Sequence, residues 1–178
     1  MGNVYAFRKR DTMGMNPDVN IVYILQAIGL TILFVGLIGF ERQRRNKIAG
    51  LTTHLLVALG AVGLTIVQQT MVQDLFEFIE QNPQYVQDSG FVVTFNHQRQ
   101  RIVAQVVSGI GFLGTGAILK TNGYISGLTT ASTLWISAII GIIFGYGMFT
   151  LGITLSLSIL FVLTIIKNVI RHNVDDHS

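Results

Sequence analysis

Residues 21–40 read IVYILQAIGLTILFVGLIGF, and ERQRR follows directly at 41–45. Gln26 is the only strongly polar side chain in the first run, and about 20 apolar residues are enough for an α-helix to cross a bilayer. A secretory signal peptide would have a shorter apolar core, followed by a small-residue cleavage site. Because basic residues follow instead, we expect a retained transmembrane helix.

Four further apolar runs follow, at 51–72, 102–119, 127–145 and 148–166. Hydrocarbon offers no water to backbone groups, so runs that span it must be helical. Only 12% of the 178 residues are charged, against roughly 25% in soluble domains. The sequence therefore predicts an all-α, polytopic membrane helix bundle with about five transmembrane helices.

The chain divides into a polar tail at 1–20, a transmembrane domain at 21–167 and a short tail at 168–178, and we expect no soluble C-terminal domain. Within the transmembrane domain, the polar segment 73–100 contains Pro83 and Gly90. These features predict an outer loop with at most a short amphipathic helix at 75–79.

Basic residues in short loops favour the cytoplasmic side of a membrane. If the chain crosses five times, one side receives most of the basic residues near the spans. This distribution predicts an N-terminus outside and a C-terminus in the cytoplasm. The residues on the cytoplasmic side would be Arg42, Arg44, Arg45, Lys47, Lys120, Lys167 and Arg171.

Helices in lipid associate through close packing at small residues and through interhelical hydrogen bonds. Small residues gather on one half of the third predicted helix and on one face of the fourth, so we expect both surfaces to turn into the bundle. Close packing alone is enough to explain them, but such faces also make a homo-oligomer plausible. The predicted packing residues are Ser108, Gly109, Gly111, Gly114, Gly116, Thr130, Ala131, Ala138, Gly141 and Gly145.

The sequence does not indicate an enzyme or a nucleic-acid-binding protein. GIGFLG at 109–114 matches the G-x-G-x-x-G dinucleotide fingerprint, but it lies inside an apolar span rather than after a strand. Cysteine is absent, which excludes disulfides and thiolate metal sites. No nucleophile stands with a base and an orienting partner, and we expect no catalytic residues and no cofactor.

Six polar residues near the membrane boundaries or inside the spans are candidates for function: Glu41, Arg42, Arg45, His54, Arg101 and Gln105. Glu41 either pairs with a nearby basic residue or acts at membrane depth. His54 either is a hydrogen-bonded structural residue or titrates or binds a metal. Gln105 can link helices or line a polar cavity. A magnesium path would need several oxygen ligands, and the metal ligands cannot be assigned.

Three motifs in order resemble the MgtC/SapB family of bacterial inner-membrane proteins. They are GFERQRR at 39–45 running on to AGLTTHLLVALGA at 49–61, then RIVAQVVSGIGFLG at 101–114, and GLTTASTLW at 127–135. The positions that carry the resemblance are Glu41, Arg42, Arg45, Gly50, His54, Arg101, Gln105, Gly109, Gly111, Gly114, Thr130 and Trp135.

The resemblance implies a multi-pass plasma-membrane protein linked to adaptation to low magnesium. It also implies a non-enzymatic regulator of another membrane complex, such as the proton-translocating ATP synthase, that acts through helix contacts. The alternative is a magnesium or other cation transporter, and a bound magnesium ion would fit that reading. The expected partners are membrane lipid, further copies of the chain and a membrane protein complex.

Overall fold

The computed structural model describes residues 20–81, 89–121 and 123–166. In these residues five α-helices follow one another: α1 (Ile21–Arg44), α2 (Leu51–Gln81), α3 (Ser89–Gly116), α4 (Leu128–Gly145) and α5 (Phe149–Phe161). A short π-helix, η2 (Val162–Ile166), continues α5, and a small hairpin of β1 (Leu119–Thr121) and β2 (Tyr124–Ser126) joins α3 to α4. The predicted all-α membrane bundle is confirmed.

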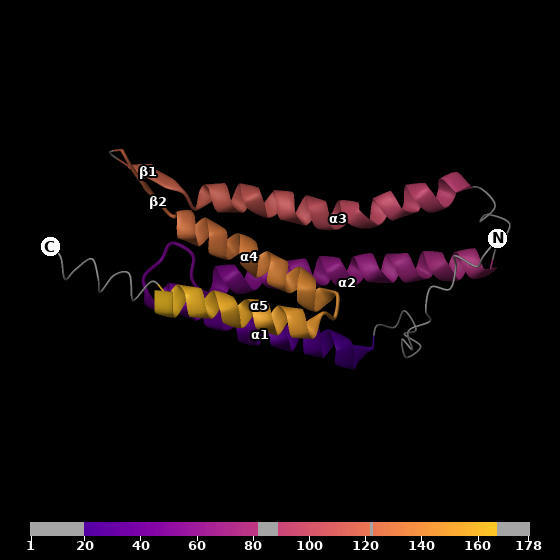
Figure 1. The fold of residues 1–178 in the computed structure, drawn as a ribbon, viewed down its shortest axis with the longest axis horizontal. Helices are drawn as coiled ribbons and strands as arrows, with labels where there is room; N and C mark the ends of the chain where they lie inside the picture. Colours follow the sequence, from indigo (N-terminus) through magenta and orange to yellow (C-terminus); the bar gives the residue numbers. More distant parts are fainter. Residues whose placement is uncertain (1–19, 82–88, 122, 167–178) are drawn as a thin grey trace.

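Successive helices run antiparallel along one long axis, so α2 and α4, which pack together, run in the same direction (Figure 1). The loop after α1, the hairpin and the start of α4 lie at one end, which we call the hairpin end. The α4–α5 turn and the start of α1 lie toward the other, the far end. α2 packs on both α1 and α4, whereas α3 lies mainly on α4 at the edge of the bundle.

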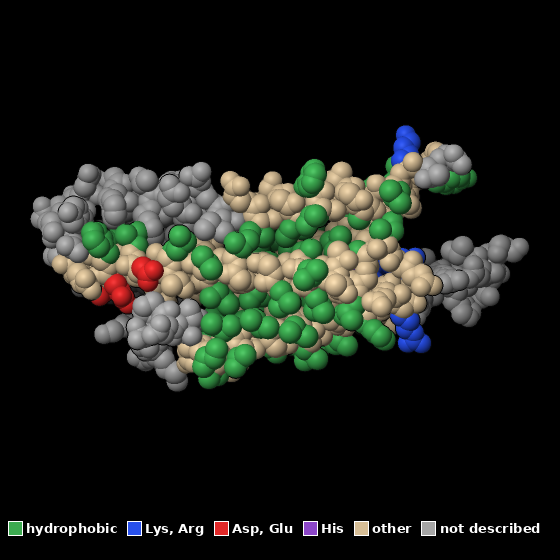
Figure 2. Space-filling view, turned by 180° about the vertical axis from the view of Figure 1, so that it is seen from behind, with side chains coloured by type: hydrophobic (Ala, Val, Ile, Leu, Met, Phe, Trp, Pro, Cys, Tyr) green, Lys and Arg blue, Asp and Glu red, His purple; other side chains and the backbone are tan. Residues whose placement is uncertain are grey.

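Three helices, α1, α2 and α4, are long and apolar enough to cross a membrane. The 18 residues of α4 measure about 27 Å at the helical rise, close to the thickness of the hydrocarbon. Two shorter apolar helical segments, Val103–Gly116 and Phe149–Ile165, lie beside them. Figure 2 shows one face of the molecule: on it apolar side chains gather in the middle, Lys and Arg lie at the hairpin end, and Asp and Glu lie toward the other end.

The segment 73–100 differs from the predicted outer loop. α2 continues to Gln81 and α3 already begins at Ser89, so most of this segment is helical. At 31 residues, α2 is about 46 Å long and exceeds the hydrocarbon thickness. Loss of apolar character therefore marks where a helix leaves the membrane and not where the helix ends.

The hairpin at Leu119–Ser126 is not predicted by the sequence pattern. Its strands pair Leu119 with Ser126 and Thr121 with Tyr124. Gly127, which follows, has φ +87° and forms the N-cap of α4. A Cβ atom there would lie 1.8 Å from the Ala117 carbonyl oxygen, so only glycine allows α4 to start this close to the end of α3.

The main apolar core lies between α1, α2, α4 and α5. Val35 and Ile38 of α1 meet Ala58 of α2 and Ile140 and Phe144 of α4. α5 approaches α4 at Gly152, where a Cβ atom would lie 2.4 Å from the Phe144 ring. This core holds α1, α2 and α4 side by side, and a smaller apolar cluster of Ala49, Ala117 and Leu134 packs near the hairpin end.

Candidate functional site

Arg42 lies in the last turn of α1 and is almost completely buried, with 1% of its surface exposed. Its Nη2 atom donates a hydrogen bond to Oγ1 of Thr130, at 2.6 Å. Thr130 is also buried and belongs to the first turn of α4. One hydrogen bond thus joins the end of the first helix to the start of the fourth.

The surroundings of Arg42 are electrostatically unusual. A helix N-terminus carries a partial positive charge, and Arg42 places a full positive charge against the first turn of α4. The Nε and Nη1 atoms of Arg42 have no hydrogen-bond partner among the described residues. Burial of a cation is costly unless it is paired, and charged residues at membrane depth usually have a functional or pairing role.

Glu41 supplies the negative charge of this region. Its carboxylate forms an ion pair with Arg45, one helical turn further along α1. Its Oε2 atom is buried and has no hydrogen-bond partner among the described residues. Of the two interpretations of Glu41 that the sequence leaves open, the ion pair with a neighbouring basic residue is present, and its partner is Arg45.

His54 links α2 to α4. It is completely buried, its Nδ1 atom lies 2.7 Å from the Gly50 carbonyl oxygen, and its Nε2 atom lies 3.0 Å from Oγ1 of Thr133. A carbonyl oxygen only accepts, so Nδ1 carries a hydrogen. The arrangement matches the structural reading of this histidine.

The Thr133 hydroxyl has two alternative acceptors. Its oxygen lies 3.0 Å from the Thr130 carbonyl oxygen and 3.0 Å from Nε2 of His54. A neutral His54 with its hydrogen on Nδ1 accepts the hydroxyl proton at Nε2. A doubly protonated His54 instead donates to Thr133, whose hydroxyl then turns to Thr130. The charge of His54 is thereby coupled to the first turn of α4.

We call Glu41, Arg42, Arg45, His54, Thr130 and Thr133 the polar cluster. It holds two arginines and one carboxylate, whereas magnesium sites are built from oxygen ligands and usually include carboxylates. Within the described ranges, no three His, Cys, Asp or Glu residues lie close enough together to hold a metal ion. The chemistry available to the cluster is hydrogen bonding, ion pairing and proton exchange at His54.

A second group of polar contacts, at the far end, was not predicted from the sequence. Tyr23 of α1 and Gln69 of α2 both donate to the carbonyl oxygen of Gly145, the last residue of α4, the latter at 2.6 Å. Gln69 also donates to the Tyr23 hydroxyl, at 3.3 Å. The available signal was the pair Gln68-Gln69 within an otherwise apolar span.

The remaining two candidates, Arg101 and Gln105, belong to α3. The backbone of Arg101 belongs to α3, but its side chain lies outside the described part. Gln105 is exposed on α3. Gly114 of α3 faces Ala131 of α4, and the two helices are antiparallel. Counting nine residues back from Gly114 reaches Gln105, and counting nine residues forward from Ala131 reaches Ile140. Gln105 is therefore level with Ile140, roughly 18 Å from the start of α4 and within the span.

The small residues of α4 pack mainly on α2. A Cβ atom at Gly141 would lie 2.3 Å from the Ala58 carbonyl oxygen, and one at Gly145 would lie 2.7 Å from the Thr65 Cβ atom. Ala138 is buried in a cluster with Ala61 of α2 and Ile110 of α3, and Ala131 faces Gly114 of α3. The small face of α4 therefore turns inward, toward α2 more than toward α3.

The small face of α3 turns the other way. Ser108, Gly109, Gly111 and Gly116 are exposed, and a Cβ atom at any of the three glycines would meet nothing within 4 Å among the described residues. Valines and Ile110 of α3 face the bundle instead. The expectation that this face turns inward is wrong for the single chain. Small faces pack against helices, but those helices can belong to the same chain or to another one.

A model of the MgtC family matches residues 28–172. The chain belongs to the MgtC family. YhiD of Escherichia coli (strain K12), whose name proposes it as a magnesium transporter, is 39% identical over 146 residues, which are 80% of this chain and 60% of YhiD. Protein MgtC of Brucella abortus (strain 2308) is 40% identical over 65% of this chain and 40% of its own length.

Protein MgtC of Salmonella typhimurium is 38% identical over 138 residues, or 78% of this chain and 49% of that protein. The MgtC-family chain described here thus spans about half the length of these relatives. No solved structure matches it. The polar cluster and the exposed face of α3 both lie inside the region matched by the MgtC model.

Proposed function

We propose that this MgtC-family membrane protein is a non-enzymatic regulator that binds another membrane protein through the outward face of α3. The observation that carries the proposal is the composition of that face. Its residues are small or polar apart from Phe112, which is 82% exposed. We call it the docking face, and it consists of Ala104, Gln105, Ser108, Gly109, Phe112, Thr115 and Gly116.

Gln105 gives the docking face its strongest requirement for a partner. It lies at membrane depth, level with Ile140, and its side chain makes no hydrogen bond to another described residue. Hydrocarbon cannot satisfy an amide, and glutamine side chains in membranes form hydrogen bonds across helices. A second helix on the docking face would supply the partner, and the glycines would let its backbone approach closely.

The family resemblance suggests a role in adaptation to low magnesium and a partner such as the proton-translocating ATP synthase. The docking face also suits a second copy of the chain, because a twofold contact places the same surface on both sides. We place the protein in the bacterial inner membrane with the hairpin end in the cytoplasm. Basic residues in the short loops at that end support this orientation.

Cation transport is the second candidate, favoured by the name of the E. coli relative YhiD. The polar contacts around Arg42 and around Gly145 lie at opposite ends of α4. Between them Gly141 packs directly on Ala58, inside an apolar layer. This separation of the two polar groups supports regulation more than a continuous path for an ion.

Cysteine cross-linking tests the docking face, because the chain contains no cysteine of its own. Ser108→Cys places one thiol on the docking face, and Ser158→Cys places one on the exposed side of α5 as a control. We expect Ser108→Cys, and not the control, to cross-link in native membranes, and Gln105→Leu to reduce the yield. The mass of the product distinguishes a second copy from another protein.

Two outcomes would contradict the proposal. Equal cross-linking at Ser108 and Ser158 would remove the docking face from consideration. Saturable magnesium flux into vesicles that contain only this protein would favour the transporter. A low-magnesium growth assay with the Gln105→Leu variant then links the contact to the physiological role.

A further inference from the structure

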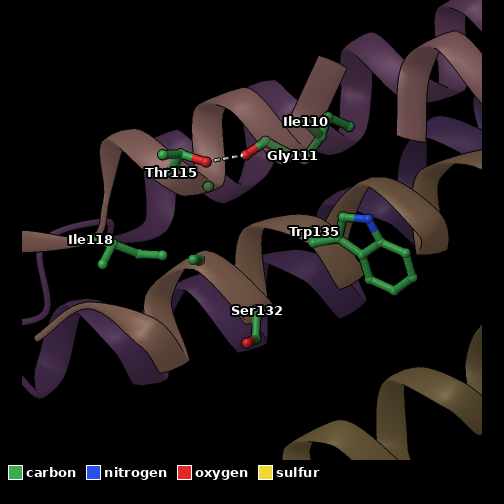
Figure 3. Close-up of a pocket in the computed structure, with 8 residues that line it drawn as sticks. Ile110, Gly111, Thr115, Ile118, Ser132 and Trp135 are labelled. Carbon is green, nitrogen blue, oxygen red and sulfur yellow. Dashed lines mark hydrogen bonds between the residues drawn. The ribbon is translucent and has the colours of Figure 1, made fainter. Parts of the chain in front are cut away.

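A second outward surface lies beside the docking face, in the groove between α3 and α4. Its volume is about 300 Å³, and its lining includes Ile110, Gly111, Thr115, Ile118, Ser132 and Trp135. Figure 3 places Ile118 at one end of the groove and Trp135 toward the other. Gly114 and Ala131 touch beneath it, so the two helices approach closely and the groove is shallow.

The hydroxyl groups in the groove are already used. Thr115 donates to the Gly111 carbonyl oxygen at 2.9 Å (Figure 3), and Ser132 donates to the Leu128 carbonyl oxygen at 2.9 Å. Each bond is made within the residue's own helix, and the other lining side chains named above are hydrocarbon apart from the indole N–H of Trp135. An occupant therefore gains mainly by filling the groove with hydrocarbon and little by hydrogen bonding.

The length of the groove distinguishes a lipid from a helix. Ile110 and Ile118 are eight residues apart, which is roughly 12 Å at the helical rise. The hydrocarbon of a bilayer is about 30 Å thick, so one leaflet contributes about 15 Å. The groove therefore matches one acyl chain of the leaflet at the hairpin end, whereas a transmembrane helix would need a surface about twice as long.

The charge at the mouth of the groove indicates the headgroup. Lys120 of β1 follows two residues after Ile118 and is exposed, and Tyr124 of β2 is 82% exposed. Exposed tyrosine and lysine are typical of the membrane–water boundary. A parallel second copy would bring its own basic hairpin end beside Lys120, whereas an anionic headgroup complements it.

We propose that the α3–α4 groove binds one anionic phospholipid, with an acyl chain between Gly111 and Trp135 and its phosphate beside Lys120. The site borders the docking face, with Thr115 common to both surfaces, and it does not depend on the regulatory function proposed above. A lipid bound here would contact both α3 and the hairpin. It would thereby hold the edge helix in place.

Trp135 allows a direct test because it is the only tryptophan in the chain. The full chain is reconstituted in phosphatidylcholine vesicles containing a small fraction of phospholipid with brominated acyl chains, which quench tryptophan fluorescence on contact. Brominated phosphatidylglycerol is compared with brominated phosphatidylcholine. We expect about fivefold tighter apparent binding of the anionic lipid, the effect of one basic residue near a membrane surface.

Matched variants separate the contribution of the lipid headgroup from that of the acyl chain. Lys120→Gln should abolish the preference for phosphatidylglycerol, whereas Lys47→Gln, an exposed lysine on the α1–α2 loop, should retain it. Gly111→Leu should fill the groove and reduce quenching by both lipids, whereas Gly29→Leu on α1 should not. Ser132→Leu fills the same groove from α4 and replaces Gly111→Leu in the test if that variant does not fold.

Three results would overturn the proposal. They are equal quenching by the two brominated lipids, a preference that survives Lys120→Gln, and quenching that is unchanged when both Gly111→Leu and Ser132→Leu are folded. Weak quenching by both lipids in the unmodified chain, together with cross-linked dimers, would assign the groove to a second copy instead.

Discussion

Arg42 and Thr130 are 88 residues apart in the chain, yet the guanidinium Nη2 and the hydroxyl Oγ1 lie 2.6 Å from each other. This is the only described hydrogen bond of the Arg42 side chain, because Nε and Nη1 have no partner among the described residues. The position of this buried cation therefore depends heavily on one hydroxyl group.

Thr130→Val tests that dependence. The substitution keeps the shape of the side chain but removes the acceptor, so a buried donor of Arg42 loses its partner. We expect a loss of about 1–3 kcal/mol in the free energy of unfolding, measured by thermal denaturation in detergent. Thr129→Val, at the exposed neighbouring position, should change it by less than about 0.5 kcal/mol. Equal effects of the two substitutions would contradict the assignment.

His54 and Thr133 should act as a coupled pair. Thr133→Val leaves Nε2 of the buried His54 without its partner, whereas His54→Leu leaves the Thr133 hydroxyl with only its second acceptor, the Thr130 carbonyl oxygen. The double variant removes both groups, so its cost should be smaller than the sum of the two single costs by about 0.5–3 kcal/mol. A double-mutant cycle in the free energy of unfolding measures this difference, and simple additivity would show that the bond contributes nothing.

Gly141→Ala should destabilise the protein, whereas Gly63→Ala should stabilise it. A Cβ atom at Gly141 would lie 2.3 Å from the Ala58 carbonyl oxygen, so the change overpacks the α2–α4 contact and should cost about 1–3 kcal/mol. Gly63 of α2 is exposed with nothing within 4 Å of its Cβ position. Alanine there should stabilise the helix by up to about 1 kcal/mol. Melting temperatures of the two variants compared with the parent chain are sufficient to decide.

Tyr23 and Gln69 should compensate for each other. Both donate to the Gly145 carbonyl oxygen, so Tyr23→Phe or Gln69→Leu alone leaves one donor in place. Each should cost about 0.5–1.5 kcal/mol. The double variant should cost more than the sum, because the last carbonyl of α4 then loses both side-chain donors. A double variant no worse than the sum of the single ones would show that the two bonds are independent.

Much of the fold follows from the pattern of apolar residues. The predicted starts of the runs at 21, 51 and 127 lie at or next to the observed starts of α1, α2 and α4. The end of α2 and the start of α3 differ from the predicted limits at 72 and 102. Hydropathy indicates where a helix meets lipid, whereas the hydrogen bonds of the helix continue into water. The hairpin has only three residues in each strand, too short for a strand pattern to be recognised.

The site was predicted in part. Charge at membrane depth points to Glu41, a titratable ring within a span points to His54, and the family resemblance adds Arg42 and Arg45. The four residues lie together. Thr133 was missed because a threonine inside an apolar helix gives no sign of which residue its hydroxyl will meet. The direction of the small face of α3 could not be derived either, because a helical wheel defines faces but not neighbours.

Both ends of α4 are anchored, at its start by Arg42 and His54 and at its end by Tyr23 and Gln69. α3, by contrast, rests on α4 through valines, Ile110 and the approach of Gly114 to Ala131. Among the described residues the contacts of α3 with α4 are apolar, whereas a displacement of α4 would break hydrogen bonds at both of its ends. Hydrogen bonds therefore join α1, α2 and α4 into one unit, and α3 packs on the edge of that unit through apolar contacts.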